Sequence, residues 1–436
     1  MNKFSLFTLI LCFGISLNAQ KVAFQEFNLD NGLHVILHQD NTVPIVVTSV
    51  LYHVGSKNEN SERTGFAHFF EHLLFEGTKN IGRGEWFKLV SANGGKNNAY
   101  TNSDYTYYYE VFPSNNLELS LWMESERMLH PIINEIGVET QNEVVKEERR
   151  LRYDNSPYGR WNEEVRKRIF NNHPYKRSTI GKMEHLDAAT LDEFIAFNKK
   201  FYVPNNAVLV VAGDFEIEPT KKLVETYFKD IPKGEKIEQI AVHDKPILEA
   251  ISGETFDKNI QIPALFTAYR IPEKTSRDSK VLDMISSYLS DGRSSKLYRK
   301  LVDEKKMSLQ VNAFNMSMED YGVYVILALP VGENSLSTLR DEIDLEIDKI
   351  QSELISQKDY DKLLNKFESN FVDSNSTVEG IANSLADYYT FYGDTNLINS
   401  EIEIYRSISR EEIQAVAKKY LNPNQRLTLN YLPESN

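Results

Sequence analysis

Two histidines and a glutamate stand at the spacing of a metal site in the segment His68-Phe69-Phe70-Glu71-His72. In a helix, His68 and His72 lie one turn apart on one face, so both imidazoles can reach a single tetrahedral metal ion. Glu71 lies beside them, where it can take a proton from a metal-bound water. The residue types and their spacing therefore predict metal-assisted hydrolysis, with two histidine ligands and Glu71 as the general base.

The residues around this segment favour one short helix that is held in a core. Gly65 precedes it and Gly77 follows it, and its remaining positions are mostly apolar. Two simpler interpretations remain. The spacing can arise by chance, or the helix can be half buried with histidines that bind no metal.

A catalytic zinc ion takes three protein ligands and leaves a position for water, so one ligand must come from elsewhere. The helix predicted over about 138–153 carries three candidates: Glu143, Glu147 and Glu148. On helical geometry Glu148 has one more apolar neighbour, Val145, than Glu147 has. We therefore expect Glu148 to face inward. The alternative is that all three belong to a charged outer face.

Length and composition indicate a globular chain of more than one domain. The chain has 436 residues, of which 41% are hydrophobic and 26% are charged. Its net charge of −14 argues against nucleic-acid binding, which needs a basic face. A solvated acidic surface explains this charge most simply.

The N-terminus has the pattern of a secretory signal peptide over 1–19. Lys3 precedes an apolar run, and cleavage is expected after Ala19. We therefore expect a periplasmic or secreted protein. The chain's single cysteine, Cys12, lies in this leader, and the bulky Leu11 before it makes lipoprotein anchoring there unlikely. The mature protein would contain no cysteine, so any metal must be held by histidine and carboxylate.

Strands and helices follow one another without strict alternation, which predicts an α+β fold. Strands are expected at 22–29, 33–38, 45–54, 98–101 and 105–112 in the first half, and a long helical stretch at about 336–390 in the second. The hydrophobic periodicity of strands and helices fades between Pro232 and Pro246. We therefore predict an N-terminal metal-binding domain at 20–231, a linker at 232–246 and a C-terminal domain at 247–436.

An internal repeat relates the two predicted domains. The segment ending Tyr-Val-Pro204-Asn resembles the one ending Leu-Asn-Pro423-Asn, and the two prolines lie 219 residues apart. The same offset carries the motif helix onto the stretch 287–291, which contains no histidine. The sequence thus predicts two copies of one domain, of which the first alone has metal ligands.

On these residues the chain resembles the insulinase or pitrilysin family of zinc metallopeptidases, which includes mitochondrial processing peptidases and bacterial periplasmic enzymes. The resemblance extends beyond the motif to six further segments: 98–101, 104–109, 143–150, 202–206, 208–214 and 291–298. It implies two homologous α+β domains, each a mostly antiparallel sheet with helices packed on one face. It also implies one zinc ion per chain.

The resemblance bears on individual residues too. The family places its third ligand about as far downstream as Glu148 stands from His72. Some members carry a further glutamate where this chain has Gln141. Family members bind substrate along the edge of a strand, which implies Asn98 and Ala99 as substrate-binding residues. The alternative is an ordinary strand pair with its tyrosines packed outward.

One departure concerns the partners of the chain. Active members receive an arginine and a tyrosine, seven residues apart, from a C-terminal domain or a partner chain, whereas this chain has Val302 and Leu309 there. We therefore expect a zinc-dependent metalloendopeptidase that is the catalytic half of a two-subunit enzyme, with a paralogous partner or as a homodimer. The alternative is a non-catalytic structural or peptide-binding subunit.

Overall fold

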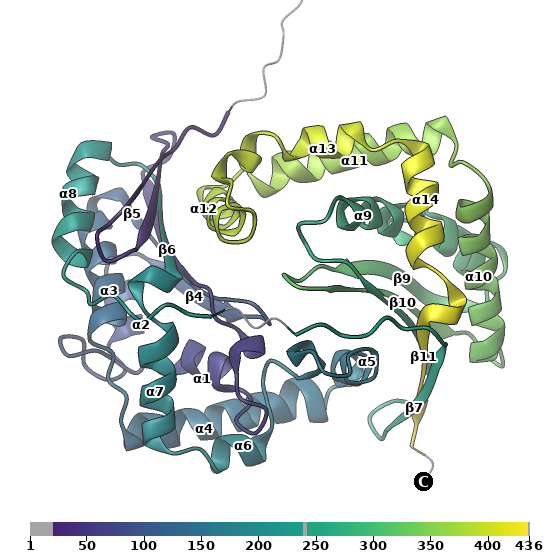
Figure 1. Ribbon diagram of the computed structural model, residues 1–436, viewed down its shortest axis with the longest axis horizontal. Helices are drawn as coiled ribbons and strands as arrows, with labels where there is room; N and C mark the ends of the chain where they lie inside the picture. The colour runs from purple at the N-terminus through teal and green to yellow at the C-terminus, as the bar shows by residue number, and fades with distance from the viewer. Residues whose placement is uncertain (1–20, 239–241, 435–436) are drawn as a thin grey trace, which may run out of the picture.

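The computed structural model describes residues 21–238 and 242–434, which form two halves side by side (Figure 1). The predicted leader, its cleavage site at Ala19 and Cys12 lie outside the described residues. Within the described ranges, none of the helices has the length and apolar character that crossing a membrane requires.

The first half is built on a six-stranded sheet in the order β1-β2-β6-β3-β5-β4. β2 and β6 run parallel, and the other neighbours are antiparallel. Gly32, with a φ of 90°, lies in the turn between the first two strands. The strands are β1 (Gln25–Asn28), β2 (His34–Gln39), β3 (Ile45–Tyr52), β4 (Lys96–Thr101), β5 (Thr106–Pro113) and β6 (Ala207–Gly213).

Helices of the first half pack mainly on one face of this sheet, where the largest apolar core lies. The helices of the first half are α1 (Phe66–Leu73), α2 (Trp86–Ala92), α3 (Leu117–Leu129), α4 (Glu135–Arg149), α5 (Trp161–Ile169), α6 (Met183–Asp187), α7 (Leu191–Phe201) and α8 (Ile217–Phe228), and α5 is the one that packs on the other sheet. A π-helical turn, η3 (Arg150–Asp154), extends α4. Short 3-10 turns are η1 (Ser56–Asn58), η2 (Ser114–Asn116), η4 (Pro174–Lys176) and η5 (Pro204–Asn206).

The second half holds a five-stranded sheet in the order β7-β11-β8-β10-β9, with β7 and β11 parallel. Its strands are β7 (Ile251–Asp257), β8 (Ala264–Ile271), β9 (Ser308–Met316), β10 (Gly322–Pro330) and β11 (Arg426–Pro433). Its helices are α9 (Arg277–Ser290), α10 (Leu336–Ser352), α11 (Gln357–Ser374), α12 (Val378–Asp387), α13 (Glu401–Ser407) and α14 (Arg410–Tyr420). The turns η6 (Tyr298–Glu304) and η7 (Tyr388–Tyr392) are π-helical, and η8 (Thr395–Asn399) and η9 (Pro423–Gln425) are 3-10.

The two halves repeat one topology, as the internal repeat predicted. Strands β3 and β8 begin at Ile45 and Ala264, and helices α7 and α14 begin at Leu191 and Arg410, so each pair is offset by 219 residues. The order β2-β6-β3-β5-β4 in the first sheet corresponds strand by strand to the order of the second. The α+β class with two homologous halves is therefore confirmed. Between the sheets, 232–238 and 242–250 form neither helix nor strand.

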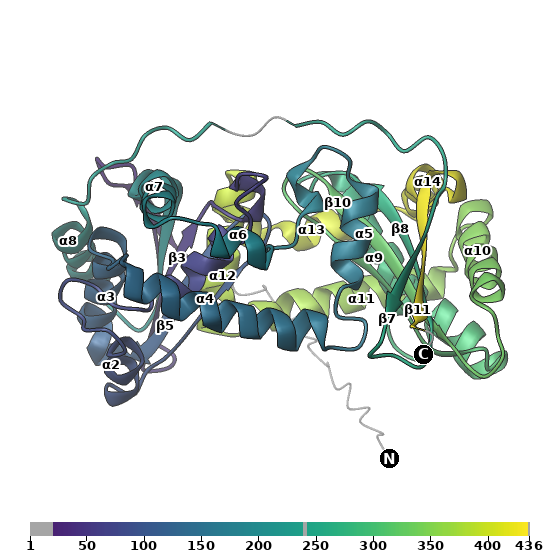
Figure 2. The same ribbon diagram turned by 90° about the horizontal axis from the view of Figure 1, so that it is seen from below.

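Each half also lends a helix to the other, so the sheets are covered on both faces. Helix α12 packs on the face of the first sheet that the helices of the first half leave free. There Ile381 and Leu385 join Val47 and Val210 in one apolar cluster. Helix α5 packs in the same way on the second sheet (Figures 1 and 2). This exchange buries apolar surface that belongs to both halves, and it holds the halves together.

A buried charge cluster joins the halves beside this apolar contact. Lys57 Nζ lies 2.5 Å from Glu319 and 3.2 Å from both Asp320 and Asp104. Glu319 and Asp320 belong to the turn between β9 and β10, so the second half contributes two of the three carboxylates. Burial alone would lower the pKa of Lys57, but the three carboxylates outweigh it and raise that pKa above its ordinary value.

Lys57→Met should lower the free energy of unfolding by about 3–5 kcal/mol, because it leaves buried carboxylates without their cation. Urea denaturation measures this change. The matched control is Lys88→Met, since Lys88 is exposed and pairs with Glu85 on the surface of α2. A loss no larger for Lys57→Met than for the control would show that the cluster does not hold the halves together.

Candidate metal centre

Helix α1, which carries His68, Glu71 and His72, begins at a glycine that no other residue can replace without strain. Gly65 has a φ of 96°, and a Cβ atom there would lie 2.7 Å from the carbonyl oxygen of Ile180. Because a glycine has no side chain to cap the helix, the cap comes from a residue outside the helix. The buried carboxylate of Glu59 accepts hydrogen bonds from the amides of Gly65 at 2.8 Å and Ala67 at 2.9 Å.

Burial raises the pKa of Glu59 to about 8, although these amide hydrogen bonds act in the opposite direction. No local pattern in the sequence marks Glu59 as a cap, because it stands outside the helix and reaches it only through the fold.

The apolar face of α1 fixes the direction of its polar face. Phe66 stacks on Phe194 of α7 at 4.5 Å between ring centroids, and the hydroxyl of Tyr108 donates to the carbonyl of Phe70 at 2.7 Å. With that face in the core, His68, Glu71 and His72 line a cavity on the other side. His68 is buried, and the other two are half buried.

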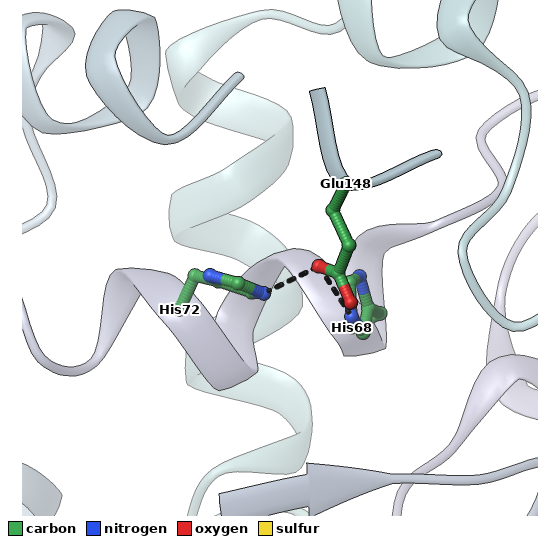
Figure 3. A group of neighbouring side chains, drawn as sticks. All are labelled: His68, His72 and Glu148. Carbon is green, nitrogen blue, oxygen red and sulfur yellow. Dashed lines mark ion pairs between the residues drawn. The ribbon is translucent and has the colours of Figure 1, made fainter. Parts of the chain in front are cut away.

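Glu148, near the end of α4, lies opposite both histidines. Its Oε2 is 3.4 Å from Nε2 of His68 and 3.2 Å from Nε2 of His72. Figure 3 shows its carboxylate pointing between the two rings, which project from neighbouring turns of α1. The structure thus brings together the three residues predicted as metal ligands.

The geometry of these atoms fits a zinc ion. Ligand atoms about 2.0–2.2 Å from a tetrahedral zinc lie roughly 3.3–3.6 Å from one another. The two distances from Glu148 are close to that range, and the three ligand atoms all lie within 4.8 Å of one another. Two imidazoles and one carboxylate are also a donor set that suits catalytic zinc. Glu71 stands outside this trio while lining the same cavity.

The charge of Glu148 is set by its neighbours. Burial by itself would raise the pKa of this carboxyl, but hydrogen bonds from His68 and His72 outweigh burial and hold the pKa well below its ordinary value. Its second oxygen, Oε1, lies 2.8 Å from Nη1 of Arg152, which is exposed. Glu148 is therefore an ionised carboxylate, as a metal ligand must be.

The apolar neighbours of Glu148 in the predicted helix are the reason to expect it inward, and only one of the three, Val145, lies in the core. Val145 is fully buried, as that argument requires, but Val144 and Leu151 are 43% and 62% exposed. The rejected candidates, Glu143 and Glu147, pair with surface cations on the outer side of α4. The inward face is thus narrower than the apolar pattern suggested.

The cavity has a volume of about 830 Å³ and both halves line it. Asn98 and Ala99 of β4 lie on its wall, and β4 is an edge strand that pairs with β5 alone among the described strands. The opposite wall comes from the second half, which the sequence did not predict. Its residues there are Lys274, Met316, Ser317, Met318 and Phe391.

Two further histidines, and the positions where this chain departs from the family pattern, lie away from the trio. His53 pairs with Glu319 at 2.7 Å, in the charge cluster between the halves, and His130 lies beside Glu126. Gln141 donates to Glu76 at 2.5 Å. Val302 and Leu309 are not among the residues of the described chain that line the cavity.

Comparison with known families identifies the class of protein that this fold and site define. The profile described as Insulinase (Peptidase family M16) matches residues 34–182, and the profile described as Peptidase M16 inactive domain matches residues 188–367. The chain therefore belongs to the insulinase family, peptidase family M16. His68, His72 and Glu148 all lie in the first matched region.

Individual relatives agree with this assignment. The chain is 29% identical to the zinc protease PqqE of Helicobacter pylori over 98% of this chain and 97% of that protein. It is 25% identical to an uncharacterized zinc protease of Rickettsia felis, over 92% and 95% of the two chains.

Solved structures share the fold. A crystal structure of a protease from Helicobacter pylori matches with a TM-score of 0.89 and 28% identity, over 94% of this chain and 99% of that one. The periplasmic protease PqqL of Escherichia coli matches with a TM-score of 0.76 and 19% identity, over 94% of this chain but 47% of that one. The second likeness concerns the fold alone.

Zinc content should distinguish Glu148 from its neighbour. Glu148→Ala should lose stoichiometric zinc, because two imidazoles alone hold the ion weakly, whereas Glu147→Ala should keep it since Glu147 faces outward. Elemental analysis after dialysis against buffer with trace zinc measures both. Equal zinc content in the two variants would remove Glu148 from the ligand set.

Proposed function

We propose that the chain is a zinc-dependent metalloendopeptidase that hydrolyses peptides or unfolded polypeptides. His68, His72 and Glu148 hold the ion, and Glu71 is the general base. The observation that carries this proposal is the convergence of three suitable ligand atoms within 4.8 Å of one another, with the carboxylate of Glu71 lining the same cavity. The zinc protease names of the relatives support it.

The chemistry divides between the ion and the protein. A zinc ion held by His68, His72 and Glu148 would supply Lewis-acid chemistry, which makes a water molecule more acidic and polarises the scissile carbonyl. Glu71 accepts the proton of the attacking water and passes it to the leaving amine. Glu148 would contribute a carboxylate oxygen to the ion, and its negative charge would offset part of the charge of the metal.

The edge of β4 supports a mode of substrate binding. A peptide that pairs with this edge as an added strand places its backbone beside the metal centre, with Asn98 and Ala99 in contact. Main-chain hydrogen bonds do not depend on side chains, so many sequences can bind. A cavity of about 830 Å³ that both halves enclose suits an extended segment better than a folded domain.

The proposal includes a partner chain. The positions where active family members have an arginine and a tyrosine are here Val302 and Leu309, and these lie away from the cavity of the described chain. The solved chain of PqqL is about twice as long as the region that matches this protein. A second subunit, either paralogous or another copy, would supply the missing pair and close the cavity.

We also propose that the protein acts in the periplasm or is secreted. The apolar N-terminal run with cleavage after Ala19 supports this, and the related fold of PqqL is that of a periplasmic protease.

A second candidate function is that of a non-catalytic structural or peptide-binding subunit. It is favoured by the match of 188–367 to a domain described as inactive. The convergence of the metal ligands in the first half speaks for catalysis, because a purely structural role gives no reason for them to meet.

Glu71→Gln should keep near-stoichiometric zinc but lose at least about 100-fold in cleavage rate, because the proton acceptor is gone while the ligands remain. Elemental analysis and a quenched fluorescent peptide measure the two effects. Cleavage at the wild-type rate would exclude Glu71 as the base. Absence of cleavage by the wild type, with and without a partner, would favour the non-catalytic alternative.

The purified single chain should cleave this peptide slowly, and addition of the partner subunit should raise the rate by at least tenfold. The physical reason is that the second chain supplies polar groups which hold and polarise the substrate. Size-exclusion chromatography with light scattering establishes the oligomeric state of each sample. Full activity of a monomer would contradict the proposed two-subunit arrangement.

A further inference from the structure

The metal centre depends on the relative placement of two helices that are far apart in sequence. His72 and Glu148 are separated by 76 residues, and no covalent feature of the chain fixes the distance between α1 and α4. A zinc ion tolerates deviations of only about 0.2 Å in its ligand distances. Some contact must therefore set the separation of the two helices near the ligands.

Helices α1 and α4 cross each other, and at the end of the crossing away from Glu148 they are in direct contact. Gly137 of α4 packs against the side chain of Leu73, where an added Cβ would lie 3.4 Å from Cδ1. Close by, Gln141 donates to Glu76 just beyond α1. These contacts leave the other end of the crossing, which carries Glu148 and His68, to be fixed separately.

Arg149 makes the connection at that end. Its Nη1 donates to the carbonyl oxygen of Gly181 at 2.7 Å. Gly181 has a φ of 73° and packs directly on the start of α1, because a Cβ added there would lie 2.4 Å from the backbone of Gly65. Gly65 is in turn held by Glu59 through its amide. The chain of contacts thus runs from Arg149 through two glycines to the first turn of α1.

We propose that Arg149 is a positioning residue of the metal centre. It follows Glu148 directly, so its bond to Gly181 fixes the end of α4 against the beginning of α1, three residues before His68. The side chain of Arg149 is 13% exposed, and the bond to Gly181 is shielded from competing water. This inference rests on the proposed zinc site, and it concerns how the protein holds its ligands at the right separation.

A purely structural role is the competing explanation, because Arg149 also contacts Glu163 at 3.3 Å and Asp154 at 3.8 Å. Loss of those contacts would lower the stability of the metal-free protein without changing zinc affinity. Stability and zinc affinity must therefore be measured separately.

The test compares the wild type, Arg149→Met, Arg149→Lys and the matched control Arg150→Met in the full chain. Arg150 is the next residue in the chain, is exposed, and pairs with Glu147. Circular dichroism of the zinc-free proteins gives the temperature range in which each is folded. Zinc affinity is then measured within that range by competition with a chromophoric chelator. Cobalt added in place of zinc reports the coordination geometry through its visible absorption.

Arg149→Met should bind zinc about 10–100-fold more weakly and give an altered cobalt spectrum, as loss of an outer-shell partner does in other metal sites. Arg149→Lys should recover part of the affinity, and Arg150→Met should match the wild type. Wild-type affinity in folded Arg149→Met, or an equal loss in Arg150→Met, would overturn the proposal.

If Arg149→Met does not fold, Arg149→Gln takes its place in the test, because the shorter glutamine side chain reaches the carbonyl of Gly181 poorly. A loss of zinc affinity of at least about threefold would support the inference, and wild-type affinity would overturn it. The outcome is separable from the proposed function. A wild type that binds zinc but cleaves no peptide would contradict the peptidase and leave this inference intact, whereas a wild type that binds no zinc would remove both.

Discussion

The close approach of α1 and α4 is the constraint on which the rest of the structure depends. It brings the carboxylate of Glu148 to within 3.4 Å of both imidazoles, although the two helices are distant in sequence. Glycine permits this approach at the Gly65–Gly181 contact, where an added Cβ would overlap backbone atoms, and Gly137 lies against Leu73 at the other end.

The exchange of helices between the halves explains why a half without metal ligands still belongs to the site. Helix α12 covers the first sheet and α5 covers the second, so neither sheet is complete without the other half. The same arrangement brings Met316, Met318 and Phe391 onto the wall of the metal cavity. The second half thus lines part of the cavity, and the buried ion pairs around Lys57 join it to the first half.

Much of the fold followed from periodicity, and the misses have identifiable causes. The strand predicted over 98–101 begins two residues earlier, at Lys96, because its start is set by pairing with β5 and not by apolar residues. The helical stretch expected over 336–390 is three helices and a π-helical turn, with breaks at 353–356 and 375–377. The predicted domain boundaries and the roles of Asn98 and Ala99 stay predictions.

The sequence by itself determined the local chemistry: the spacing of His68, Glu71 and His72 on one helical face, and the duplication of the domain. It did so because helical geometry links neighbours in the chain to neighbours in space. The sequence favoured Glu148 over Glu147, but only the tertiary structure showed that its carboxylate meets both histidines, that Glu59 caps α1, and that the second half forms a wall of the cavity. Those contacts join residues of different elements, and the packing of the elements brings them together.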